Sequence, residues 1–323
     1  MYIMKKSLSI IGHFFYQPVA AETLGCFRIV VSVFALIQFL ILFPDWMLLY
    51  GPNGILPWQV TDTLATSYMP GLTKFMNLFS FINISAEGTV YTVTAIYFFS
   101  LVGLLMGYKT RIMAILAWLS HLTINTTGHF TAYGVETFLH IALFYCVVLP
   151  VNISRSIDSR IRPITVPSYL ITLSVRIIQF HLCLMYCASG LEKAMGGQWW
   201  NGEAIWIAMQ QDQFHQVNIN WMANASWVPK LLCWGTLAVE ILYPFGMLWR
   251  RTKKCWLLGI LSMHLFIAIF LGLHLFGALM FLLNLSAFGE HCFPGIFSRH
   301  QKKWWRYQVQ YDTNNIGEVF NPS

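Results

Sequence analysis

Residues 24–43 read LGCFRIVVSVFALIQFLILF and carry a single charged side chain, that of Arg28. A helix needs about 20 mostly apolar residues to cross the hydrocarbon core of a bilayer, so this stretch predicts a membrane span. The whole chain agrees, because 57% of its residues are hydrophobic and only 10% are charged, whereas a soluble globular domain has about 25% charged residues. This composition excludes a water-soluble enzyme, a disordered chain and a charge-rich coiled coil.

Apolar stretches of similar character recur along the chain as far as residue 288. Together with the first one, they predict an all-α fold, a polytopic integral membrane helical bundle of about eight transmembrane helices. Several of them are shorter than a straight span requires, above all the third and the last. The further stretches lie at 90–107, 112–124, 135–151, 169–188, 231–249, 255–272 and 274–288.

The formal net charge of +7 fits either nucleic-acid binding or membrane topology, and the positions of the basic residues decide between them. If the N-terminus is inside, most of the 20 lysines and arginines fall in cytoplasmic segments, and Lys74, Lys193 and Lys230 fall outside. This bias follows the positive-inside rule, so we expect a multi-pass protein of the cell membrane with both termini cytoplasmic and no nucleic-acid partner. The expected parts are a cytoplasmic segment 1–23, a transmembrane domain 24–288 and a cytoplasmic tail 289–323.

Two segments on the predicted outer side are too long to be simple turns. The segment 44–89 contains an amphipathic run at 72–82, and the segment 189–230 is rich in Trp, Gln and Asn. Long connections over a compact bundle are often functional, so we expect a binding surface or a lid on this side.

Charged residues inside a span are costly and are therefore candidates for a functional or a structural role. We expect Arg28 and Arg176 to snorkel or to make structural pairs, because both lie nearer the cytoplasmic end of their spans. Glu240 lies near the expected bilayer midplane, where a carboxylate must pair or take up a proton. Arg176 or a histidine is a candidate partner, and a structural ion pair and a site residue are equally open.

The predicted topology brings titratable groups from different segments to the outer ends of helices. They are His129, Glu136, Lys193 and His274. Such convergence predicts a site that is open to the outer leaflet, with chance alignment as the alternative. The histidines and cysteines lack the spacing of a metal-ligand set, so no metal is expected.

Lys193 is the residue that we single out, in the segment YCASGLEKAMGGQWWNG at 186–202. An amine that is partly dehydrated at the membrane interface gives up its proton more readily and can act as a base. The alternative is an interfacial lysine that snorkels without further function.

This segment resembles the HTTM superfamily, the membrane domain shared by vitamin K-dependent gamma-carboxylase and many bacterial proteins. The family pattern of a Tyr, a small-Gly pair, a Lys and Trp-x-x-Gly is similar to Tyr186, Ser189-Gly190, Lys193 and 199–202. Further similarities follow the family order and span about 24–288. They are the Arg28-bearing opening at 24–29, the His-x-x-x-Tyr-Gly element of His129 and Tyr133, and His264 with Phe266.

The resemblance implies carboxylase-like chemistry, in which the matching lysine deprotonates a reduced vitamin K, so a quinone or hydroquinone is a candidate cofactor. It implies catalytic roles for Lys193, His129 and His264. Pocket or charge-partner roles are then expected for Tyr133, Tyr186, Glu240, His274, Arg176 and Arg28. Glu192 stands where the family has a basic residue, and we expect no counterpart of the carboxylase's large lumenal domain.

Within the family, the length is most similar to that of the sporulation-delaying protein B group. That likeness implies maturation of a secreted peptide toxin, with the peptide precursor and a separately encoded maturation protein as partners. Two alternatives stay open: a quinone-dependent carboxylase or oxidase in its own right, and a non-enzymatic immunity or scaffold protein.

Overall fold

The computed structural model describes residues 18–64, 69–128, 132–214, 219–249 and 251–292, and every secondary-structure element in these ranges is a helix. The all-α prediction is therefore confirmed. Four of the described helical segments are long and apolar enough to cross a membrane. They are Glu22–Tyr50, Ala86–Met106, Ser168–Ala194 and Lys253–Phe270, and shorter apolar helices lie at Gly134–Val148 and His274–Glu290.

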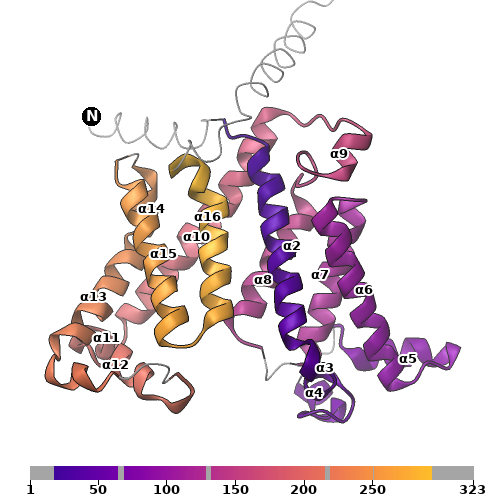
Figure 1. Ribbon diagram of the computed structural model, residues 1–323, viewed down its shortest axis with the longest axis horizontal. Coiled ribbons are helices and arrows are strands. Elements are labelled where there is room, and N and C mark those ends of the chain that lie inside the picture. The colour runs from indigo at the N-terminus through magenta and orange to yellow at the C-terminus, as the bar shows by residue number, and fades with distance from the viewer. Residues whose placement is uncertain (1–17, 65–68, 129–131, 215–218, 250, 293–323) are drawn as a thin grey trace, which may run out of the picture. The chain divides into compact units, whose positions relative to one another are not determined.

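The chain divides into two compact units, which we call the N-terminal unit (Leu24–Thr165) and the C-terminal unit (Met1–Thr23 with Val166–Ser323). Figure 1 shows the helices of each unit. In the N-terminal unit, α6 packs on α7 and α7 packs on α8. The four predicted stretches of this unit coincide with α2 (Glu22–Leu42), α6 (Ala86–Met106), α7 (Thr110–Thr127) and α8 (Gly134–Val148).

The segment 44–89, which the sequence placed on the outer side, contains short helices. The amphipathic run at 72–82 is helical and leaves Leu78 and Phe81 exposed. These elements are η1 (Phe43–Asp45), α3 (Trp46–Tyr50), α4 (Trp58–Leu64), α5 (Leu72–Phe79) and η2 (Ser80–Ile82). A short helix α9 (Ile157–Ile161) follows α8 in the same unit.

In the C-terminal unit, α10 packs on α13, and α15 packs on α16. Shorter elements follow α10, and α11 and α12 pack on α13. The principal helices of this unit are α10 (Ser168–Ala194), α13 (Trp227–Ile241), α15 (Lys253–Phe270) and α16 (His274–Cys292), and the short α14 (Tyr243–Leu248) follows α13. The shorter ones are α11 (Gly197–Asn201), α12 (Glu203–Gln210), η3 (Asp212–Phe214) and η4 (Asn220–Asn224).

The apolar stretch at 231–249 is not one continuous helix, because two helices, α13 and α14, occupy it and separate at Leu242. Pro244 lies in the first turn of α14. Proline has no backbone N–H, so it cannot donate to the carbonyl of the residue four positions earlier, and its ring crowds that carbonyl. The residue at that position is Glu240, which therefore lies next to the break in the helix.

Arg28 does not snorkel, because its side chain is fully buried in the N-terminal unit. The guanidinium donates to the backbone carbonyls of Val151 (3.3 Å), Leu104 (2.5 Å), Leu105 (2.6 Å) and Arg155 (2.6 Å). The planar guanidinium has donors in several directions, so one side chain can join segments that are far apart in sequence. Arg28 thus makes the structural contacts that were one of its two expected roles.

The turn between α6 and α7 packs against the segment that follows α8, at residues 156–158. Gly107 has a φ of +68°, and a Cβ atom there would lie 2.4 Å from Cβ of Ser156. Asp158 accepts hydrogen bonds from the backbone N–H groups of Lys109 (2.8 Å) and Thr110 (2.8 Å) and from the Thr110 hydroxyl (2.7 Å). Burial by itself raises the pKa of Asp158, but these hydrogen bonds outweigh it and leave the pKa below its usual value. Asp158 therefore caps the start of α7.

We predict that Arg28→Lys lowers the stability of the protein by about 3 kcal/mol, because a lysine ammonium cannot reach all of the carbonyls that the guanidinium joins. The measurement is the thermal unfolding midpoint of the detergent-solubilised protein. Arg162→Lys is the control, because Arg162 is exposed. Equal midpoints for the two variants would contradict the structural role of Arg28.

Candidate functional site

The amine of Lys193 lies in a polar cluster where α10 meets α13. Its Nζ atom donates to Oε2 of Glu240 at 2.8 Å and to Oγ of Ser189 at 2.5 Å. The side chain of Glu240 is only 6% exposed, and that of Lys193 is 26% exposed. The cluster therefore contains an ion pair whose carboxylate is buried and whose ammonium is partly accessible.

Gly190 allows this pair to form. A Cβ atom at position 190 would lie 2.8 Å from Cγ1 of Ile241 and 2.9 Å from Cβ of Glu240. The absent side chain thus lets the backbones of α10 and α13 approach closely, and Lys193 stands one turn beyond Gly190 on the same helix. In the small-Gly pair, Gly190 allows the close approach of the two helices, and Ser189 accepts a hydrogen bond from the amine.

A second group of polar side chains lies within the C-terminal unit. The hydroxyl of Tyr186 lies 2.7 Å from Nε2 of His264, and it accepts a hydrogen bond of 2.7 Å from Nδ2 of Asn284. The hydroxyl of Tyr243 donates to Oδ1 of Asn284 at 2.7 Å. All four side chains are buried. Helices α10, α14, α15 and α16 each contribute one residue to this chain of hydrogen bonds.

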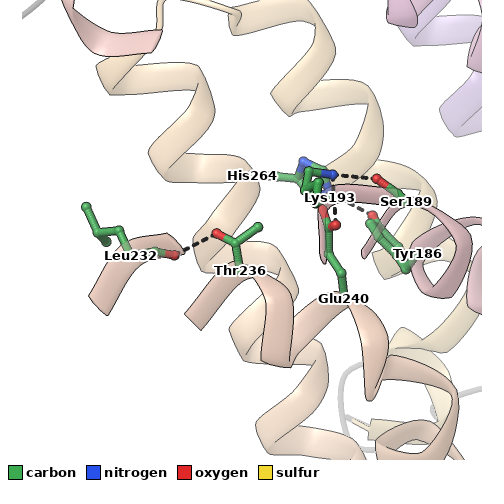
Figure 2. A network of polar contacts seen from close by, with 7 residues as sticks. All are labelled: Tyr186, Ser189, Lys193, Leu232, Thr236, Glu240 and His264. Atoms are coloured by element: carbon green, nitrogen blue, oxygen red, sulfur yellow. Dashed lines mark hydrogen bonds and ion pairs between the residues drawn. The ribbon is translucent and has the colours of Figure 1, made fainter. Parts of the chain in front are cut away.

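Figure 2 shows Tyr186, Ser189, Lys193, Glu240 and His264 converging, with Thr236 and Leu232 apart from them on α13. The two groups are close enough for electrostatic interactions between them. Lys193 interacts in this way with His264, and Glu240 interacts with Tyr186. The amine of Lys193 lies 5.6 Å from the centre of the Trp199 ring, a cation–π distance. We call the residues Tyr186, Ser189, Lys193, Glu240 and His264 the Lys193 cluster.

Several of the predicted site residues lie elsewhere. Arg176 is buried rather than snorkelling, and its Nη1 atom donates to Oε1 of Gln179 at 2.6 Å. Gln179 in turn donates to the carbonyl of Ala287 on α16, also at 2.6 Å. His274 is exposed at the first position of α16. Glu240 therefore has Lys193 as its partner, not the Arg176 or histidine that the sequence suggested.

Three other predicted residues belong to the N-terminal part of the sequence. Arg28 makes the carbonyl contacts given above, and Tyr133 precedes α8, where its backbone N–H donates to Oε2 of Glu136 at 2.8 Å. Both lie in the N-terminal unit. His129 falls outside the described residues.

The cluster that forms is not the group of residues at the outer helix ends that the topology predicted. The predicted topology grouped Lys193 with His129, Glu136 and His274, yet Lys193 pairs with Glu240, which the sequence placed near the midplane. The sequence interpretation also missed three hydrogen-bond partners: Ser189 for the amine, Asn284 for Tyr186, and Tyr243 for Asn284. An available signal was Asn284 itself, because an amide within the apolar stretch 274–288 needs hydrogen-bond partners.

Within the described ranges, no group of His, Cys, Asp and Glu side chains is arranged to hold a metal ion. The side chains of the Lys193 cluster offer an amine, a carboxyl group, a hydroxyl, a phenol and an imidazole. Groups of these types can donate and accept protons.

Comparison with protein families gives one match for this chain, the HTTM domain, over residues 16–290. The matched range contains every residue of the Lys193 cluster as well as Arg28. Comparisons with curated proteins and with solved structures gave no match.

We predict that Gly190→Ala lowers stability by about 1–3 kcal/mol, because the new methyl group forces α10 and α13 apart. Gly235→Ala is the matched control, since Gly235 lies within α13 and a Cβ atom there would meet nothing within 4 Å. In a helix interior that change should raise stability by about 0.5–1 kcal/mol. Thermal unfolding of both variants in detergent tests this, and a stabilised Gly190→Ala protein would show that the helices do not meet at this glycine.

Proposed function

Because the chain belongs to the HTTM domain family, we propose that it is a membrane-embedded acid–base catalyst that matures an exported peptide, with the amine of Lys193 as its working group. The observation that carries the proposal is the Lys193 cluster. It brings an amine, a buried carboxylate and a buried imidazole together among apolar helices. Titratable groups gathered in this way are typical of sites that move protons.

The ion pair gives the amine a route to its neutral form. Transfer of one proton from the Lys193 ammonium to the Glu240 carboxylate leaves a neutral amine beside a carboxylic acid, and the total charge is unchanged. The distance of 2.8 Å between Nζ and Oε2 allows a direct transfer. Buried charges are costly, and the neutral pair avoids that cost. The neutral amine then accepts a proton from a bound substrate, while the Ser189 hydroxyl keeps it in position.

The substrate that we propose is the precursor of a secreted peptide toxin, with a separately encoded maturation protein as a partner. The support is the resemblance to the sporulation-delaying protein B group. The protein would then be a multi-pass protein of the cell membrane, with about eight spans, both termini cytoplasmic and the transmembrane domain at 24–288. The apolar helices described above support this placement.

A second candidate function is a quinone-dependent carboxylase or oxidase, and one observation favours it. Nδ1 of His264 is a buried polar atom with no hydrogen-bond partner among the described residues, and His264 interacts electrostatically with Lys193. Both residues can hydrogen-bond to the oxygen atoms of a quinone and would hold it. A bound quinone would supply a redox couple. Oxygen uptake by the purified protein with a naphthohydroquinone distinguishes this function from the first.

We predict that Lys193→Arg reduces the amount of mature peptide by about 100-fold or more, because a guanidinium can pair with Glu240 but cannot give up its proton. The assay is mass spectrometry of the exported peptide from cells that carry the precursor gene and each variant. Lys230→Arg is the control, since Lys230 is an exposed lysine of α13. Protein levels in the membrane fraction are measured in parallel.

The assay also includes cells that lack the gene, and tolerance of the toxin is measured in them. Wild-type maturation by the Lys193→Arg protein would reject the amine as a base and leave the ion pair as a structural contact. Maturation that continues in cells without the gene, together with lost tolerance of the toxin, would identify an immunity protein. Unchanged maturation and unchanged tolerance in those cells would reject the peptide as the substrate.

A further inference from the structure

The donor and the acceptor can be assigned in each hydrogen bond of the Asn284 side chain. The Nδ2 group of Asn284 lies 2.7 Å from the carbonyl oxygen of Met280, and a carbonyl oxygen can only accept. This contact identifies Nδ2 as the donor side of the amide and Oδ1 as the acceptor side. Oδ1 then accepts from the Tyr243 hydroxyl, and the second hydrogen of Nδ2 goes to the oxygen of Tyr186.

The direction continues from Tyr186 to His264. Since the Tyr186 oxygen already accepts from Asn284, its own hydrogen is free to go to Nε2 of His264, 2.7 Å away. In a neutral imidazole only one ring nitrogen carries a hydrogen, so acceptance at Nε2 puts that hydrogen on Nδ1. The chain of donors then runs from Tyr243 through Asn284 and Tyr186 to His264.

The opposite tautomer leaves more polar groups unpaired. If Nε2 of His264 carried the hydrogen, the Tyr186 oxygen would accept twice and its own hydrogen would have no partner among the described side chains. The lone pair of Nδ1 would also be unpaired, because Nδ1 has no hydrogen-bond partner within the described ranges. The direction given above leaves one unpaired group, the Nδ1 hydrogen. Unpaired buried polar groups are costly and rare, so the direction with fewer of them is favoured.

We infer that Asn284 is a positioning residue, which acts through Tyr186 to hold His264 in the tautomer that carries its hydrogen on Nδ1. His264 therefore offers a donor to whatever binds there. The Nδ1 hydrogen has no partner among the described residues, and it suits an oxygen acceptor such as a carbonyl or a carboxylate oxygen. The inference concerns the resting protein and does not depend on the reaction that Lys193 performs.

Nitrogen NMR of the full-length protein in lipid nanodiscs, labelled with 15N-histidine, reads the tautomer directly. The His264 signals are identified by their loss in His264→Gln. In the wild type we expect the form with hydrogen on Nδ1 to outnumber the other by about tenfold or more. A wild-type signal dominated by hydrogen on Nε2 would overturn the inference without any variant.

Two substitutions test the direction of the chain. Asn284→Leu removes the donor to the Tyr186 oxygen, so Tyr186 can accept from Nε2 of His264 as well as donate to it, and the excess of the Nδ1 form should fall. Tyr186→Phe removes the donor to Nε2, so the excess of the Nδ1 form should be lost. Asn224→Leu and Tyr169→Phe are controls at exposed positions of the same unit. An unchanged ratio in both folded test variants would show that the chain does not set the tautomer.

Discussion

A lysine amine that lies between apolar helices needs a partner for its charge, and the arrangement of the Lys193 cluster follows from this requirement. Glu240 supplies the opposite charge at 2.8 Å. For the two groups to meet, α10 must come close enough to α13 that position 190 has no room for a side chain. The break between α13 and α14 at Leu242 lies directly after this contact. Backbone approach, helix break and ion pair are therefore parts of one local structure.

The chain handles its buried charges in two different ways. Arg28 and Arg176 are both buried. Arg28 donates to backbone carbonyls, and Arg176 donates to the amide oxygen of Gln179. These contacts bind segments together, and a guanidinium keeps its proton. Lys193 instead faces a carboxylate and a hydroxyl and stays partly accessible. This difference is the physical reason to assign function to Lys193 and structure to the two arginines.

Much of the fold could be predicted from the sequence, because a long apolar stretch in a membrane protein has few alternatives to a helix. Hydropathy could not find the end of α10, since Ser189 and Glu192 lower the local average while the helix runs on to Ala194. The same averaging hid the break near Pro244, although proline itself was a signal for it. The short helices of 44–89 and 189–230 depend on packing, which a window average does not measure.

The site was predictable only in part. Lys193 and Glu240 stood out as charged residues near or within apolar stretches, and Tyr186 and His264 through the family resemblance. The structure brings the four together. Their pairing could not be predicted, because it depends on where α10 crosses α13 and on the absence of a side chain at Gly190. Asn284 and Tyr243 were missed because their role is to orient another side chain.

The central claim is that Lys193 and Glu240 hold each other in place. A double-mutant cycle between them tests it most directly, with the free energy of unfolding of each detergent-solubilised variant as the measurement. Lys193→Met leaves a buried carboxylate without its partner, and adding Glu240→Gln removes that carboxylate's charge. We predict a coupling free energy of about 1–3 kcal/mol, with the double variant more stable than Lys193→Met alone. Additive effects, within about 0.5 kcal/mol, would contradict the claim that the two groups hold each other in place.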